Sequence, residues 1–205
     1  VKQKKLISLA RYKPILESSK FRFHAGMVML FMAIIIAYIS MVSVQLMVVM
    51  QQSTFAFSLW FGANAIVNIT ASFSAPKLVD RIGRKLAIQV SVGLALVAGI
   101  WLFVAQDSLA PLALMIPVFI SSVGISLVFA VSNAGALAPF AERAGTASAL
   151  LGFFQMTGAA VLVGLVNLLP FGPMVNFALV MCLPLIWLGL HSYSDQALFK
   201  LEEAA

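Results

Sequence analysis

Six long apolar runs dominate the chain, and short polar breaks separate them. The runs lie at about residues 24–49, 55–75, 86–105, 109–136, 146–169 and 173–191. An α-helix needs about 20 apolar residues to cross a bilayer, and each run is near that length. The runs are continuously apolar rather than alternating, which excludes a membrane β-barrel, and helices satisfy their own backbone groups in lipid. The pattern predicts an all-α membrane protein with six transmembrane helices.

Composition agrees with this prediction. Of the 205 residues, 62% are hydrophobic, against about 45–50% in ordinary soluble domains. The mean hydropathy is +1.04. A soluble domain of this size could not bury so much apolar surface, so lipid is the predicted solvent. The one cysteine, Cys182, lies in an apolar run and is predicted to pack there.

The distribution of charge predicts the topology. Lys and Arg occur in residues 1–23, in the connections 76–85 and 139–145 and in residues 192–205, whereas the other three connections hold none. Because positive residues favour the cytoplasmic side, both termini are predicted to be cytoplasmic. We therefore expect a basic cytoplasmic linker at 1–23, a six-helix bundle at 24–191 and a cytoplasmic tail at 192–205. Topology also accounts for the net charge of +6 without a nucleic-acid partner.

A strongly charged segment, Lys77–Lys85, lies between the second and third runs and reads K-L-V-D-R-I-G-R-K. We interpret it as a short loop that turns at Gly83, because glycine tolerates a positive φ. An ordinary cytoplasmic turn that obeys the positive-inside rule is the simplest interpretation. The D-R-x-G-R-K pattern also resembles the signature loop of the major facilitator superfamily of transporters. Pro76 and Val79 replace a Gly and an Ala of the family pattern, which is typical of the copy in the second half of these proteins.

By this resemblance, the loop is a cytoplasmic gate that locks and releases helix ends as a transporter changes state. The gate residues are Asp80, Arg81, Gly83, Arg84 and Lys85.

A further stretch comprises residues 133–140, residues 144–152 with the sequence A-G-T-A-S-A-L-L-G, and Gln155. It resembles the tenth and eleventh helices of bicyclomycin-resistance (Bcr/CflA) type drug:proton antiporters, and residues 12–23 resemble their linker into the seventh helix. The resemblance implies the C-terminal half of a twelve-helix, proton-coupled multidrug efflux transporter of the bacterial inner membrane. Its implied partners are a drug-like substrate, protons and an N-terminal six-helix half. The chain begins with Val1 inside a basic segment, and we expect it to be a fragment.

Neutral polar residues recur at helical spacing in four of the six runs, together with aromatic residues or Met. Residues three or four apart share one face of a helix. Such faces can hold an amphipathic, partly aromatic molecule by stacking and hydrogen bonds, and we predict that they line a substrate cavity. The alternative is that the amides only bond neighbouring helices. The candidates are Tyr38, Met41, Gln45, Phe57, Trp60, Asn64, Asn68, Ser126, Phe129, Asn133 and Gln155.

Small residues in and before the fifth run predict close helix packing or a smooth sliding surface. The candidates are Gly145, Ala149, Gly152 and Gly158. Pro117 and Pro184 lie inside runs, where each removes a backbone hydrogen bond and favours a kink.

No Asp, Glu, Lys or Arg lies inside any run. A carboxylate in the membrane would mark an ion path, so the chain is predicted to carry no embedded proton carrier of its own. His24 and His191, at the ends of the first and last runs, are interpreted as interfacial.

We find no metal-ligand cluster, nucleophile elbow or phosphate loop, which argues against an enzyme and against a metal or other cofactor. Two alternatives stay open beside the half-transporter. One is a self-contained six-helix transporter that works as a homodimer, and the other is a membrane scaffold module that transports nothing.

Overall fold

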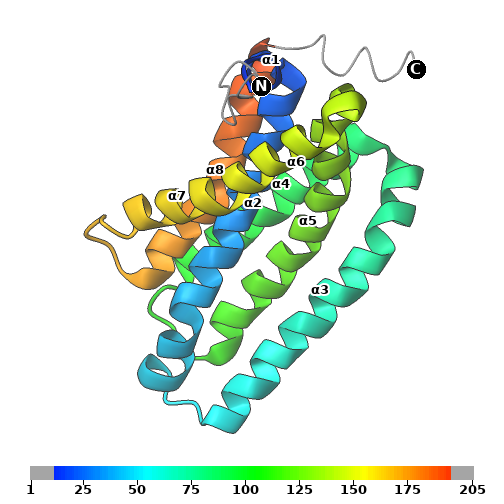
Figure 1. Cartoon of the computed structure of the whole chain (residues 1–205). Helices are drawn as coiled ribbons and strands as arrows, with labels where there is room; N and C mark the ends of the chain where they lie inside the picture. Colours follow the sequence, from blue (N-terminus) through cyan, green and yellow to red (C-terminus); the bar gives the residue numbers. More distant parts are fainter. Residues whose placement is uncertain (1–11, 195–205) are drawn as a thin grey trace, which may run out of the picture.

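The computed structural model of the chain describes residues 12–194. Every regular element in this range is helical (Figure 1). Residues 1–11 of the predicted linker and 195–205 of the predicted tail lie outside the described residues. The elements are α1 (Lys13–Glu17), α2 (Ser19–Ser43), η2 (Val44–Val49), α3 (Thr54–Ile82), α4 (Arg84–Val104), α5 (Pro111–Leu137), η3 (Ala138–Arg143), α6 (Ala144–Phe153), η4 (Phe154–Gly158), α7 (Ala159–Val166) and α8 (Pro173–Ser194).

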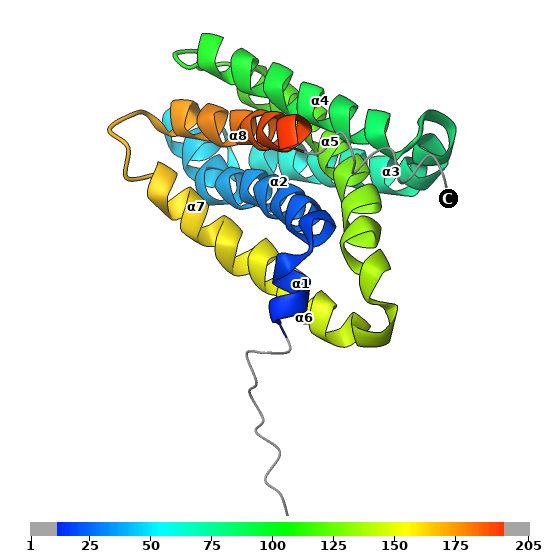
Figure 2. The same cartoon turned by 90° about the horizontal axis from the view of Figure 1, so that it is seen from above.

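Helices α2 and α5 form the centre of the bundle. Helices α4 and α8 lie side by side, and α3 and α7 lie on opposite sides of the molecule (Figures 1 and 2). The core between them contains fully buried Met27, Phe31, Leu114 and Val128. Large apolar side chains also cover the outside, and Phe73 on α3 is 82% exposed. An apolar exterior around an apolar core is the arrangement expected of a bundle that lies in lipid.

Five helical runs of the described chain are long and apolar enough to cross a membrane. The longest, Pro111–Val166, has 56 residues, and at 1.5 Å per residue it would be about 84 Å long, far more than one crossing requires. It bends at η3, where Phe140 leaves helical geometry with φ −125° and ψ 35°, so that α5 and α6 run in different directions (Figure 2). The connection predicted at 139–145 thus coincides with this kink, and a 3-10 turn rather than an irregular loop joins the two arms. The six crossings themselves stay a prediction.

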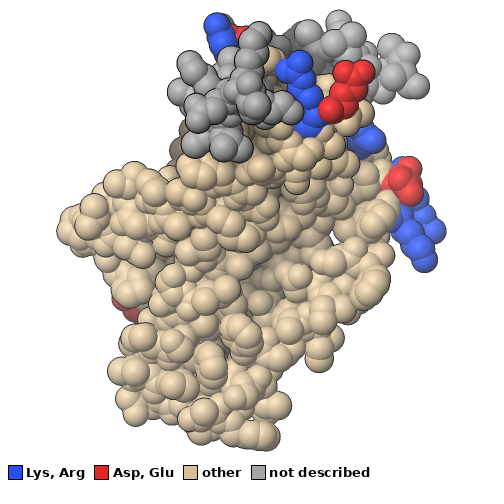
Figure 3. Space-filling view, in the orientation of Figure 1, with Lys and Arg blue, Asp and Glu red and all other residues tan. Residues whose placement is uncertain are grey.

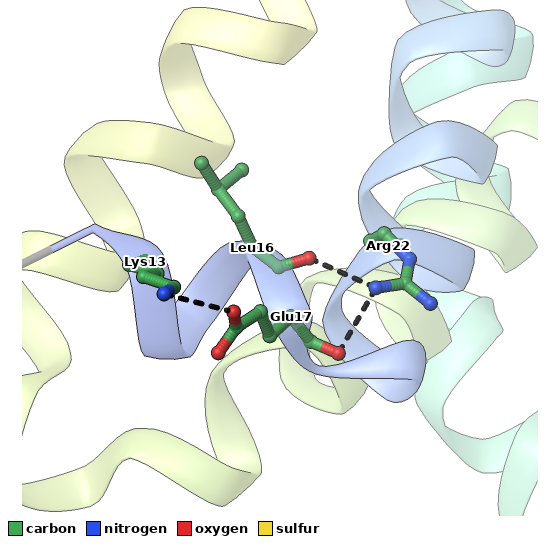
Figure 4. Close-up of polar contacts among 4 residues, drawn as sticks. All are labelled: Lys13, Leu16, Glu17 and Arg22. Atoms are coloured by element: carbon green, nitrogen blue, oxygen red, sulfur yellow. Dashed lines mark hydrogen bonds and ion pairs between the residues drawn. The ribbon is translucent and has the colours of Figure 1, made fainter.

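The described part of the basic linker is helical and fixed to the bundle (Figure 4). The guanidinium of Arg22 donates hydrogen bonds to the backbone oxygens of Leu16 at 3.1 Å and Glu17 at 2.9 Å. These bonds cap the carbonyl end of α1 and tie it to α2, which begins at Ser19. An exposed ion pair of 3.7 Å joins Lys13 to Glu17 along α1. The first apolar helix thus begins before the predicted position 24.

The charged segment Lys77–Lys85 is almost wholly helical, so the predicted loop is wrong. Helix α3 continues to Ile82, and α4 begins at Arg84. Only Gly83 breaks the helix, with φ 81° and ψ 157°, as its predicted tolerance of a positive φ allows. The backbone N–H of Gly83 still donates to the carbonyl of Val79 at 2.8 Å. One residue therefore makes the whole reversal between two long helices.

Alanine in place of Gly83 is expected to destabilise the fold by about 1–3 kcal/mol, because its Cβ is strained in this backbone region, which is almost confined to glycine. The measurement is the apparent melting temperature in detergent. Gly62→Ala in α3 is the matched control, since a Cβ at Gly62 meets no atom within 4 Å. The control is expected to be neutral or slightly stabilising, by up to about 1 kcal/mol. Equal melting temperatures for the two variants would contradict the strained turn.

Candidate functional site

A cavity of about 290 Å³ lies between α2, α3 and α5. The molecular surface is hollowed between α3 and the rest of the bundle (Figure 3). The three helices contribute apolar, aromatic, amide and hydroxyl side chains to one lining. Its residues are Ile34, Ile35, Tyr38, Ile39, Phe61, Asn64, Ala65, Asn68, Ile69, Val118, Ser121, Ser122 and Ile125.

Hydrogen bonds between α3 and α5 hold the polar side of this cavity. Ser122 Oγ donates to Asn64 Oδ1 at 2.8 Å. One turn further along α5 and two turns further along α3, the hydroxyls of Ser126 and Ser72 lie 3.1 Å apart and share a hydrogen bond. Residues four apart lie on one face of each helix, so two polar stripes meet along the contact. Asn64 bonds a neighbouring helix and also lines this cavity, and its role toward a substrate stays a prediction.

Tyr38 supplies the polar group that α2 brings to the cavity. Its ring stacks on Phe61, with centroids 6.1 Å apart and an interplanar angle of 13°. The side chain is only 6% exposed, and its hydroxyl has no hydrogen-bond partner among the described residues. Buried phenol groups normally have a partner. This hydroxyl is therefore available to a molecule that enters the cavity.

The lining contains no Asp, Glu, Lys, Arg or His. It can hold a ligand by apolar contact, by stacking and by hydrogen bonds to neutral groups, but it offers no ion pair. It also holds no side chain that would act as a general acid or base near neutral pH.

The other predicted cavity residues are distributed over several places. Met41 and Gln45 line a separate cavity between η2 and the start of α8. Phe57 packs against Phe61, and Trp60 packs against Phe119 with ring centroids 6.4 Å apart. The predicted set therefore does not line one continuous cavity.

The remaining candidates line neither of these two cavities. Phe129 packs against both buried clusters of the bundle. Asn133 is half-buried near the end of α5, and Gln155 lies in η4. Ser126 contributes through its hydrogen bond to Ser72. A role for these residues in a cavity stays a prediction.

The gate candidates lie at the junction of α3 and α4. Asp80, Arg81, Arg84 and Lys85 are all exposed. The Lys and Arg side chains visible in Figure 3 gather toward the end of the bundle where α1 lies. The position suits a charged contact with another part of a protein, and the gating role itself stays a prediction.

The four predicted packing residues differ in how closely a neighbouring helix approaches them. A Cβ at Gly158 would meet the sulfur of Met29 on α2 at 2.6 Å, so this glycine allows close approach of η4 and α2. A Cβ at Gly145 or Gly152 would meet no atom within 4 Å, and Ala149 is exposed. Close packing by these three residues is therefore not found within the described part of the chain.

Two helix approaches against a neighbouring backbone involve glycines that the sequence analysis did not select. A Cβ at Gly99 would lie 2.9 Å from Cys182 Sγ and 3.0 Å from the backbone oxygen of Ala178, where α4 meets α8. At Gly124, the nearest atom would be the backbone oxygen of Ser91 at 3.0 Å. Glycine costs stability inside a helix, so an isolated glycine in an apolar run is a usable signal for such contacts.

Two further glycines make room for rings near the end where α1 lies. A Cβ at Gly26 would overlap the indole of Trp187, and one at Gly135 would overlap the imidazole of His24. His24 is only 6% exposed, and its position at the membrane interface stays a prediction. His191 contacts the Trp187 ring at a centroid distance of 4.3 Å.

Long apolar helices, an apolar exterior and a neutral polar cavity between helices define a membrane protein. The chain matches the Major Facilitator Superfamily over residues 2–163, and it belongs to this family of transporters. The family predicted from the D-R-x-G-R-K segment is thereby confirmed, while the narrower bicyclomycin-resistance type stays a prediction.

The chain is similar to curated proteins with the name "Multidrug resistance protein MdtL". Those of Salmonella paratyphi A, Salmonella newport and Salmonella agona are each 30% identical to it over 164 residues. The similar region covers 78% of this chain and 41% of each relative. The chain thus spans about two fifths of the length of these relatives. No solved structure matches it.

Proposed function

We propose that this chain is the C-terminal half of a multidrug efflux transporter. The cavity between α2, α3 and α5 carries the proposal, in a chain that is similar to proteins named for multidrug resistance. Its walls combine aromatic rings, branched apolar side chains, amides and hydroxyls. Such walls accept amphipathic, drug-like molecules without demanding one shape. The molecule is moved and not converted, so no enzyme activity is proposed.

The proposed partner is an N-terminal six-helix half of the same transporter. The match to 41% of each relative supports a missing portion of comparable size. In the proposed alternating-access cycle, the two halves rock about a shared site and open it to each side in turn. The exposed charges of Asp80, Arg81, Arg84 and Lys85 lock the halves together at one face. The sharp reversal at Gly83 holds two helix ends next to that lock.

The proposed location is a bacterial inner membrane, with both termini in the cytoplasm. Helix α1, the α3–α4 junction and η3 all carry basic residues, and the positive-inside rule assigns such an end to the cytoplasm. Proton movement into the cell is proposed to drive drugs outward. The predicted spans hold no acidic residue, so the proton-binding carboxylate is assigned to the other half.

Phenylalanine in place of Tyr38 tests the cavity. The change removes only the buried hydroxyl that lacks a partner among the described residues, so the fold is expected to keep its stability. Loss of one hydrogen bond to a drug is expected to lower efflux about fivefold at subsaturating drug. The measurement is the initial rate of ethidium efflux from cells that produce the complete transporter, at equal protein levels.

Tyr12→Phe is the matched control, because it makes the same change outside the cavity. It is expected to leave the ethidium efflux rate unchanged. If Tyr38→Phe also leaves this rate unchanged at equal protein levels, the cavity is not the drug site.

A further inference from the structure

A second cavity, of about 360 Å³, lies toward the end of the bundle where α2 ends and α8 begins, away from the basic side chains visible in Figure 3. Residues from the end of α2 and from η2 form one wall, and the α7–α8 connection and α8 form the other. Met41, Phe171 and Phe177 give it apolar sides, and Gln45, Asn167 and Asn176 bring amides to it. None of these residues lines the cavity between α2, α3 and α5, so the two cavities are separate.

Asn176 is the informative residue of this second cavity. It is 5% exposed, and its side-chain oxygen has no hydrogen-bond partner among the described residues. Gln45, on the opposite wall, is 7% exposed. Buried amide oxygens are nearly always bonded, so an exception needs a cause. A molecule in this cavity that donates a hydrogen bond would give the Asn176 oxygen a partner.

The backbone next to Gln45 is also unusual. Residues Val44–Val49 form a π-helical turn, in which the N–H of Met50 donates to the carbonyl of Gln45 at 2.9 Å. The turn lies at the end of its helix, where π-turns are common, and it sets the position of Gln45 in the wall of the cavity. The turn shifts the register of the last residues of this helix, and it does so beside an amide that lines the cavity.

We propose that the cavity formed by Gln45 and Asn176 binds a second small molecule, an uncharged amphiphile whose polar end donates a hydrogen bond. The acceptor is the Asn176 amide oxygen, and the apolar body of the ligand lies against Met41, Phe171 and Phe177. An uncharged donor is favoured over an ammonium group because the lining holds no carboxylate to offset the cost of burying a charge. This site is independent of the proposed drug cavity.

Two matched probes test the ligand class without any substitution. They are 2-(2-naphthyl)ethanol, which donates a hydrogen bond, and its methyl ether, which does not. Isothermal titration calorimetry with the chain in nanodiscs, corrected for empty nanodiscs, is expected to show the alcohol binding about fivefold more tightly, as one hydrogen bond predicts. Equal affinities, or no binding above empty nanodiscs, would overturn the proposal.

The variant Asn176→Leu tests whether the alcohol binds in this cavity. Leucine has a similar volume and removes a buried amide that lacks a partner, so the variant is expected to fold and to melt at the same temperature or higher. It should lose the preference for the alcohol over the ether. Gln106→Leu removes an exposed amide in the α4–α5 connection and is expected to keep the preference. A preference that survives in Asn176→Leu would show that the alcohol binds elsewhere, and the proposal would fall.

Discussion

Valine in place of Gly99 is expected to destabilise the bundle by about 3 kcal/mol, the upper part of the usual range for an overpacked core. The reason is the contact between α4 and α8. A Cβ at this position already lies 3.0 Å from the backbone oxygen of Ala178 and 3.2 Å from Met181 Cβ. A backbone oxygen cannot rotate away as a side chain can, so the two helices must separate. The apparent melting temperature in detergent is expected to fall by about 6–12 °C.

Gly93→Val is the matched control, because Gly93 lies on the same helix and a Cβ there meets no atom within 4 Å. Like Gly99→Val, this variant replaces a glycine inside the helix with a branched side chain. Adding Cys182→Ala to Gly99→Val should recover only part of the stability, since the sulfur is removed while the Ala178 carbonyl remains. Similar melting temperatures for Gly99→Val and Gly93→Val would show that α4 and α8 do not approach so closely.

The chain reconstituted alone in liposomes is expected to show no proton-driven drug transport. Its predicted spans contain no Asp or Glu, and the cavity between α2, α3 and α5 has no ionisable lining residue except Tyr38. A phenol is a weak acid that stays protonated near neutral pH, so it does not serve as a proton carrier there. An imposed proton gradient should therefore drive no ethidium movement above that of empty liposomes.

A proton-coupled drug antiporter of known activity, reconstituted in parallel, is the positive control. Transport by the chain alone would overturn the half-transporter proposal and would favour the self-contained homodimer. A dependence of that transport rate on protein density in the liposomes would support association of two copies. The scaffold alternative predicts no transport in liposomes and unchanged ethidium efflux for Tyr38→Phe, which distinguishes it from the half-transporter.

Hydropathy predicted the helical class but not where the helices end. Residues 77–82 were assigned to a loop because they are charged, yet they are helical. Hydropathy reports which solvent a residue prefers, whereas a helix continues as long as its backbone hydrogen bonds do. Charged residues such as Lys, Arg and Glu favour a helix in water as well. The apolar run therefore sets the length of the membrane segment, and the backbone sets the length of the helix.

The polar stripes were found from spacing, but their grouping was not. Spacing predicts that Tyr38 and Gln45 share one face of a helix, yet Tyr38 lines the cavity beside α3 and Gln45 lines the cavity beside α8. Spacing gives the angle of a residue around its own helix. The neighbour that it meets depends on its height along that helix, on the tilt of the helices and on the π-helical turn of η2.

The sequence by itself determined that the chain is helical, that it lies in lipid, that its basic residues gather in alternate connections and that it belongs to a transporter family. These are local properties, since hydropathy, charge and a short motif such as D-R-x-G-R-K are written in neighbouring residues. Only the tertiary structure decided that Ser122 meets Asn64, that Gly99 meets Ala178, and that Tyr38 and Asn176 line two different cavities. Such contacts join residues far apart in the chain, and the rotation and tilt of whole helices select them.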